Sequence, residues 1–191
     1  MSRSILAIVA ATGLATAAAN AGEIPVLIIV DNTDPSSVTF NSTGAAAAVT
    51  DDSASIVGGI SLLDLFGGAG FNTGGSQVIG GDLSPNGNTN AYNRVFNDIG
   101  ALGTSGLNFW ASGIGGGPQT FNTTDPAFTG ATTGFDFSAA TFNLSGDIVI
   151  GDTAGIPGSG AVLGSWVLIP TPGAVGLFAM AGLAASRRRR A

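Results

Sequence analysis

The chain has 191 residues, of which only 9% are charged, and a net charge of −6. Residues 22–169 hold all twelve acids against a single base, Arg94, so this span carries −11. That balance excludes nucleic-acid binders, which need a basic surface. The chain lacks Cys, His and Lys. It therefore has no disulfide, no zinc site built from His or Cys, no His-dependent triad, no Schiff-base lysine and no P-loop lysine.

Residues 1–21 have the three parts of a secretory signal peptide. Arg3 supplies the positive start, residues 5–18 form a compact apolar segment, and Ala19-Asn20-Ala21 is a small-x-small cleavage site. Cleavage after Ala21 makes Gly22 the first mature residue. The sequence thus predicts export, with Sec-type machinery and signal peptidase as partners; an uncleaved anchor or a buried helix is the alternative.

Short apolar runs separated by frequent turn signals follow over residues 22–168. Several of these runs alternate with period two, as at Phe142/Leu144 and Ile148/Ile150. Strands are predicted over 24–30, 37–40, 55–57, 60–66, 77–79, 107–110, 135–137, 141–144, 147–150 and 162–168. Many short strands with Gly-, Asn- and Pro-containing turns predict one all-β, sandwich-like domain with Gly/Asn-rich loops.

Two stretches also fit a helix, and one fits a loop. One is residues 62–66. The other is 91–102, where the side chains of Tyr92, Val95, Phe96 and Ile99 share one helical face. Residues 67–90 have the weakest pattern, and a long loop is expected there.

The stretch DLSPNGNTNAYN over residues 82–93 is the best candidate for a binding site. An EF-hand-type loop places oxygen ligands at positions 1, 3, 5, 7, 9 and 12, with Gly at 6, and Gly87 takes that slot. The stretch resembles a dockerin calcium loop but has one carboxylate among six ligands. A polar turn-rich loop is the alternative. The predicted calcium ligands are Asp82, Ser84, Asn86, Asn88, Asn90 and Asn93.

Aspartate pairs are the other candidates for chemistry, because a carboxylate-only hydrolase needs two acids facing each other. The sequence places these aspartates at strand ends and in turns, where Asp tightens the turn. No catalytic residue and no enzymatic activity are therefore predicted, with a carboxylate hydrolase as the least favoured alternative. The pairs are Asp31/Asp34, Asp51/Asp52 and Asp147/Asp152.

The two tryptophans lie in apolar predicted strands. Trp110 belongs to 107–110 and Trp166 to 162–168. Their surroundings favour packing in the core, with stacking on a sugar as the alternative.

The C-terminal segment, residues 169–191, combines a breaker motif, a short apolar run and an arginine cluster. Residues 173–186 carry no charge and as a helix would span about 21 Å, against about 30 Å for a hydrocarbon core. Pro172 suits the first turn of such a helix. Arg187, Arg188, Arg189 and Arg190 resist transfer across a membrane. A short transmembrane helix with a cytoplasmic arginine end is predicted; a buried C-terminal helix is the alternative.

This layout resembles the PEP-CTERM sorting signal of bacterial surface and matrix proteins. Pro170-Thr171-Pro172, the apolar run 173–186 and the four arginines carry the resemblance, which is limited to this tail. It implies recognition and cleavage by an exosortase, an integral-membrane cysteine peptidase, near the Pro-containing motif. The family has Glu between the prolines, where this chain has Thr171.

Together these patterns predict an exported protein with a structural or adhesive role. We expect transient anchoring in the inner membrane, followed by location at the cell surface or in the extracellular matrix, with polysaccharide a possible partner class there. No cofactor is expected apart from calcium at 82–93. A calcium- or carbohydrate-binding surface module is the alternative function.

Overall fold

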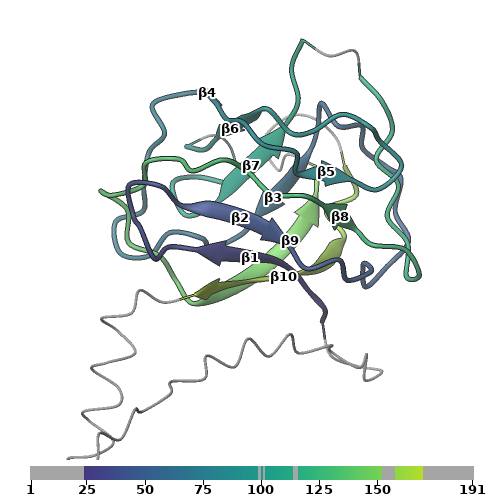
Figure 1. Ribbon diagram of the computed structural model, residues 1–191, viewed down its shortest axis with the longest axis horizontal. Helices are drawn as coiled ribbons and strands as arrows, with labels where there is room; N and C mark the ends of the chain where they lie inside the picture. Colours follow the sequence, from purple (N-terminus) through teal and green to yellow (C-terminus); the bar gives the residue numbers. More distant parts are fainter. Residues whose placement is uncertain (1–23, 99, 101, 114–115, 152–157, 170–191) are drawn as a thin grey trace, which may run out of the picture.

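The computed structural model describes residues 24–98, 100, 102–113, 116–151 and 158–169 (Figure 1). The described part of the chain is all-β and contains no helix. The ten strands are β1 (Val26–Asp31), β2 (Thr39–Ser42), β3 (Ile60–Leu62), β4 (Gln77–Val78), β5 (Ser84–Pro85), β6 (Arg94–Phe96), β7 (Leu107–Trp110), β8 (Phe128–Thr129), β9 (Ser145–Ile150) and β10 (Val162–Ile169).

Eight strands form one curled sheet in the order β2-β1-β10-β9-β3-β7-β6-β4, and β5 pairs with β8 separately. The two edges of the sheet approach each other through residues 130–135. These residues bridge to β2 through Asn41↔Ala131 and to the segment after β4 through Gly81↔Thr132. The sheet therefore wraps around the core and leaves little free edge (Figure 1).

The first and last described strands lie next to each other inside this sheet. β1 pairs with β10 in parallel, with Asp31 opposite Ile169, whereas every other strand pair in the sheet is antiparallel. β10 is also paired with β9 along its other side. The longest described strand, β10, is thus an interior strand of the sheet, hydrogen-bonded along both sides.

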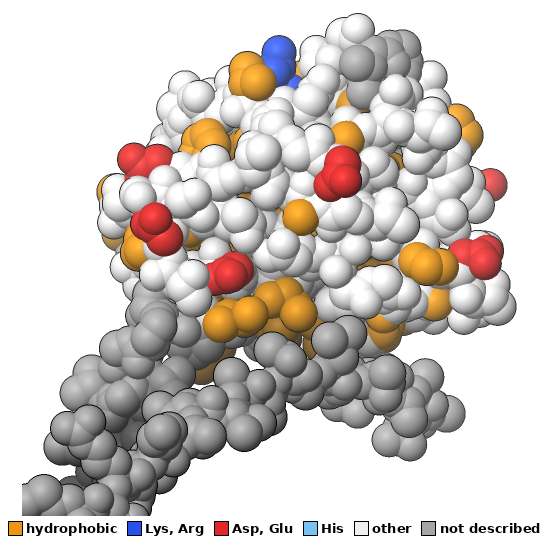
Figure 2. All heavy atoms as spheres, in the orientation of Figure 1, with side chains coloured by type: hydrophobic (Ala, Val, Ile, Leu, Met, Phe, Trp, Pro, Cys, Tyr) orange, Lys and Arg blue, Asp and Glu red, His pale blue; other side chains and the backbone are white. Residues whose placement is uncertain are grey.

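The surface carries few charges and no dense charged patch on the face in view. Figure 2 shows acidic side chains scattered singly among uncharged polar groups and backbone. This pattern follows from a composition with only 9% charged residues and many Gly, Asn, Ser and Thr.

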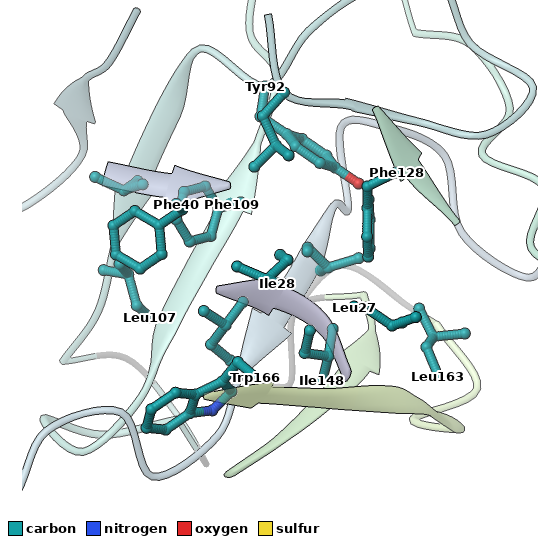
Figure 3. Packing of buried hydrophobic residues seen from close by; sticks show 14 of the residues in the cluster. Leu27, Ile28, Phe40, Tyr92, Leu107, Phe109, Phe128, Ile148, Leu163 and Trp166 are labelled. Atoms are coloured by element: carbon teal, nitrogen blue, oxygen red, sulfur yellow. The ribbon is translucent and has the colours of Figure 1, made fainter. Parts of the chain in front are cut away.

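Aromatic side chains from opposite sides of the curled sheet meet in the core (Figure 3). Phe40 of β2 packs edge-on against Phe109 of β7 with ring centroids 4.9 Å apart, and Trp166 of β10 is fully buried. The Trp166 indole donates to the carbonyl oxygen of Leu63 at 2.9 Å, so its polar atom is satisfied. Each such side chain contributes about 1.5–3 kcal/mol by leaving water, which explains how a chain without disulfides forms a stable interior.

The all-β expectation is confirmed, and the runs 24–30, 107–110, 147–150 and 162–168 are strands within a residue or two of their predicted bounds. The predicted strands 37–40, 60–66 and 77–79 appear in part. The runs 55–57, 135–137 and 141–144 form only isolated bridges, at Ser55, Phe135 and Phe142. The expected loop 67–90 is largely irregular but contains β4 and β5.

Both helix expectations are wrong. Within 91–102 the chain forms β6, with Val95 buried opposite Phe109, and then turns at Asp98, whose φ is +61°. Within 62–66, Asp64 has a φ of +52°, which a right-handed helix cannot contain. In both places pairing with a distant strand, rather than local periodicity, decides the structure.

No helix among the described residues is long and apolar enough to cross a membrane. The predicted signal peptide (1–21), the cleavage residues Ala19 and Ala21, and nearly all of the predicted sorting segment lie outside the described residues. The latter include Pro170, Thr171, Pro172 and the cluster Arg187–Arg190. Those predictions stay predictions.

Candidate functional site

A shallow hollow of about 540 Å³ opens beside the β6–β7 pair. Its apolar part is formed by Phe96 and Trp110. Its polar part is formed by Asn97 and Asp98, which follow β6, and by residues 72 and 74–76 from a loop before β4. The volume lies in the range of small-molecule sites, which combine aromatic walls with a few polar groups. This combination of aromatic and polar groups makes the hollow a candidate site.

The strand register places the two aromatic side chains on one face. Arg94 lies opposite Trp110 and Phe96 opposite Asn108, so Phe96 and Trp110 are diagonal neighbours across β6 and β7. Their ring centroids are 6.1 Å apart and the rings are nearly perpendicular, at 88°. Trp110 is only partly buried, unlike Trp166, although its Nε1 is covered and has no hydrogen-bond partner in the described chain.

Buried hydrogen bonds attach the loop at 72–76 to the end of β6. The Thr73 N–H donates to Asn97 Oδ1 at 2.9 Å, and the Asn97 N–H donates back to Thr73 Oγ1 at 3.2 Å. Asn97 Nδ2 also donates to the carbonyl of Phe71 at 2.5 Å. Thr73 and Asn97 are both buried, so this wall of the hollow is fixed by the fold.

The rim of the hollow is exposed and polar. Asn72 donates through Nδ2 to Asp98 Oδ2 and accepts the Gly74 N–H at 2.7 Å through its own Oδ1. Asp98 occupies the left-handed region, where Asp and Asn are the best tolerated residues apart from Gly. Its carboxylate, with several acceptor positions, retains capacity for a second donor.

The structure spreads the predicted calcium residues over several contacts with other segments. Ser84 lies in β5, which pairs with β8, and its hydroxyl donates to the Asp82 carbonyl at 2.8 Å. Asp82 Oδ1 accepts the Ala131 N–H at 2.9 Å, and the Asn86 N–H donates to the Ala127 carbonyl. The first half of 82–93 therefore runs extended along residues 127–131.

The second half of 82–93 contacts yet other segments. Asn88 Nδ2 donates to the Pro118 carbonyl at 2.9 Å, and Asn88 Oδ1 accepts the Asn90 N–H at 2.9 Å. Asn93 exchanges two hydrogen bonds with the main chain of Ser112. Protein hydrogen bonds thus already engage the side-chain oxygens of Asp82, Asn88 and Asn93. The calcium prediction stays a prediction, and the described chain gathers no group of three or more acidic side chains around a point.

Aspartates of the predicted pairs stabilise local turns of the main chain. Asp31, Asp34 and Asp51 each accept a main-chain N–H from the residue two positions later, at 2.8–3.0 Å. No aspartate in the described part of the chain is buried, and Asp152 lies outside it. The described carboxylates therefore offer no buried pair facing one cleft.

Asp51 is the best-connected of these carboxylates. Its partial burial raises the pKa of the carboxyl, but hydrogen bonds from Ser159 and Ser53 outweigh that effect and leave the pKa below its ordinary value. Ser159 Oγ binds Asp51 Oδ2, while the Ser159 N–H donates to Ser53 Oγ at 2.8 Å. The cluster ties residues 51–53 to the segment that leads into β10.

Comparison with protein-family models, with curated proteins and with solved structures gives no match to this chain. The arguments about function therefore rest on the residues and the fold. The sequence does not predict the hollow as a site, because it favours core packing for Trp110 and allows a helix over 91–102. The available signal was the polar sequence Asn97-Asp98 directly after Phe96.

Proposed function

We propose that this chain is an exported surface or matrix protein, held at a membrane through its C-terminal segment, whose β-sandwich-like domain has a structural or adhesive role. The signal-peptide pattern of residues 1–21 supports export. The uncharged run 173–186 followed by four arginines supports retention at the membrane with the domain outside.

The single observation that best supports the structural role is the position of β10 in the sheet. The chain leaves the described domain at Ile169, the last residue of an eight-residue strand paired with β1 on one side and β9 on the other. Tension applied at Ile169 in the direction of β10 acts along this strand. It therefore loads many inter-strand hydrogen bonds at once, in shear, instead of opening them one after another.

The processing step of this proposal belongs to a partner enzyme. An exosortase-type membrane peptidase is proposed to recognise Pro170-Thr171-Pro172 and cut near it, with Arg187–Arg190 holding the substrate in position. The chain is the substrate in that reaction, and its own residues supply no chemistry.

The test is to follow the full chain in a bacterial host that carries an exosortase-type peptidase. We expect a mature N-terminus at Gly22, a C-terminus upstream of Ala191, and protein at the cell surface. Replacing Arg187–Arg190 by four alanines should release uncut protein into the medium, because the stop to translocation is lost. Replacement by four lysines keeps the charge and serves as the matched control. Fractionation and intact-mass spectrometry measure both results.

Two results would contradict the proposal in different ways. Protein that keeps Met1 and stays inside the cell would rule out export. An intact Ala191 on surface-located protein would rule out processing while leaving membrane anchoring in place.

A further inference from the structure

We propose that the hollow beside β6 and β7 binds a short neutral saccharide, packed against Trp110 and Phe96 and hydrogen-bonded by Asp98 and the rim at 72–76. This assigns a ligand class and a site to the adhesive part of the proposed function. It concerns the folded domain, and is tested separately from export.

The aromatic side chains offer the apolar surface that a sugar ring needs. A pyranose has an apolar face of C–H groups and a girdle of hydroxyls, so it packs on an aromatic ring while its edge stays polar. Phe96 and Trp110 are both half-buried at the hollow, and their 88° interplanar angle presents two different surfaces to a ligand. Partly exposed aromatic rings side by side on a sheet leave apolar surface open to solvent, and such surface is a common feature of ligand-binding sites.

The rim supplies hydrogen-bonding groups beside the aromatic side chains. Asp98 is exposed and holds an acceptor-only carboxylate, which suits the donor hydroxyls of a sugar. Gly74 and Gly75 have nothing within 4 Å of where a side chain would stand. Ligand atoms can therefore approach the main chain of this loop closely.

The wall of the hollow is ordered before a ligand arrives. The reciprocal bonds between Thr73 and Asn97, both less than 9% exposed, hold the loop at 72–76 against the end of β6. A site on a fixed scaffold avoids the entropy cost of ordering loops on binding, which is decisive for weakly binding ligands such as sugars.

Charge restricts the class of saccharide. Residues 22–169 carry twelve acids and one base, and Asp98 stands at the rim. Uronates, sulfated glycans and phosphorylated glycans would meet repulsion both from this carboxylate and from the domain as a whole. A neutral glycan avoids both.

Calorimetric titration of the full chain with neutral tetrasaccharides tests the site. The probes are cello-, malto-, xylo- and chitotetraose, with a tetragalacturonate as the acidic comparator. We expect saturable binding of at least one neutral probe and none of the acidic one. Asp98→Asn keeps the shape and the tolerance for positive φ, and should weaken binding about tenfold by removing a charged acceptor. Trp110→Ala should weaken binding at least as much.

Asp52→Asn removes the same charge from an exposed aspartate that does not line the hollow, and should bind like the unmodified chain. Circular dichroism of each variant establishes that it is folded. If Trp110→Ala does not fold, the saccharide affinity of Asp98→Asn alone tests the proposal. The proposal is overturned if no neutral probe saturates, if only the acidic probe binds, or if folded Asp98→Asn binds as tightly as the unmodified chain. None of these results would alter the export measurements, so the two proposals fail separately.

Discussion

Gly59 shows how one residue can fix the approach of two strands. It precedes β3 with a φ of +65°, and a Cβ at this position would overlap the main-chain carbonyl of Phe109 in β7. Gly44 has a similar φ of +74° but nothing within 4 Å. Substituting the two glycines in turn therefore distinguishes two costs in unfolding free energy. Both positions require a left-handed main chain, but only position 59 also requires room beside Phe109.

Gly59→Ala is expected to lose about 4 kcal/mol or more of unfolding free energy, because a main-chain atom cannot move aside without breaking β3–β7 pairing. Gly44→Ala should lose only about 1–2 kcal/mol, the cost of a left-handed alanine. Urea unfolding measures both. Equal losses in the two variants would show that close contact with Phe109 does not constrain position 59.

At the scale of elements, the Asp51 cluster links the turn at 51–53 to the start of β10. The hydrogen bonds from Ser159 and Ser53 hold the pKa of Asp51 below its ordinary value despite partial burial. A lowered pKa in the folded state means that the carboxylate stabilises the fold above about pH 4, the ordinary range of Asp. This contribution disappears as the pH falls through the pKa of the folded protein.

Asp51→Asn should therefore flatten the loss of stability between about pH 4 and pH 2, since the variant has no proton to bind there. Urea unfolding at about pH 7, 4, 3 and 2 measures the slope, with Asp52→Asn as the matched control. If the unfolding free energy of Asp51→Asn falls with decreasing pH as steeply as that of the unmodified chain, other carboxylates cause the loss of stability in acid.

The same scale shows what the sequence could predict. β1, β7 and β10 are dense in Val, Ile, Leu, Phe and Trp, and local pattern identified them as strands. Residues 91–102 fit a helical period equally well, and pairing with β7 on one side and β4 on the other makes 94–96 a strand, with Val95 opposite Phe109, fourteen positions away. The hollow combines residues from 72–76, 96–98 and 110. The local sequence Phe96-Asn97-Asp98 indicates polar groups beside an aromatic residue, but only the register of β6 on β7 brings Trp110 next to them.

At the scale of the whole molecule, the strand arrangement predicts resistance to force that depends on direction. Ile24 and Ile169 are exposed and lie at opposite ends of the parallel β1–β10 pair. Leu144 and Ile169 are exposed and lie at the same end of the antiparallel β9–β10 pair, where the Leu168 N–H donates to the Leu144 carbonyl at 2.8 Å. Force applied between residues 24 and 169 shears the β1–β10 pair and loads its hydrogen bonds together. Force applied between residues 144 and 169 opens the β9–β10 pair from one end, one hydrogen bond after another.

Since the chain contains no cysteine, single cysteines at these positions give unique attachment points for force spectroscopy. The Ile24→Cys/Ile169→Cys chain should rupture at clearly higher force than the Leu144→Cys/Ile169→Cys chain, because its hydrogen bonds must break together. The shared handle at 169 matches the two measurements. Similar rupture forces in both chains would contradict the proposal that β10 resists force applied along its length.

The pairing of β1 with β10 also means that the sheet can be completed only when the last described strand is present. Ile29 and Val167 are neighbours in the ladder although almost the whole described domain separates them along the chain. Contacts of such long sequence separation form slowly, because a large loop must close before they gain anything. Until β10 has been synthesised, β1 and β9 lack the strand that joins them, and the sheet cannot close. The pairs β1–β10 and β9–β10 can therefore form only after nearly all of the described domain has been synthesised.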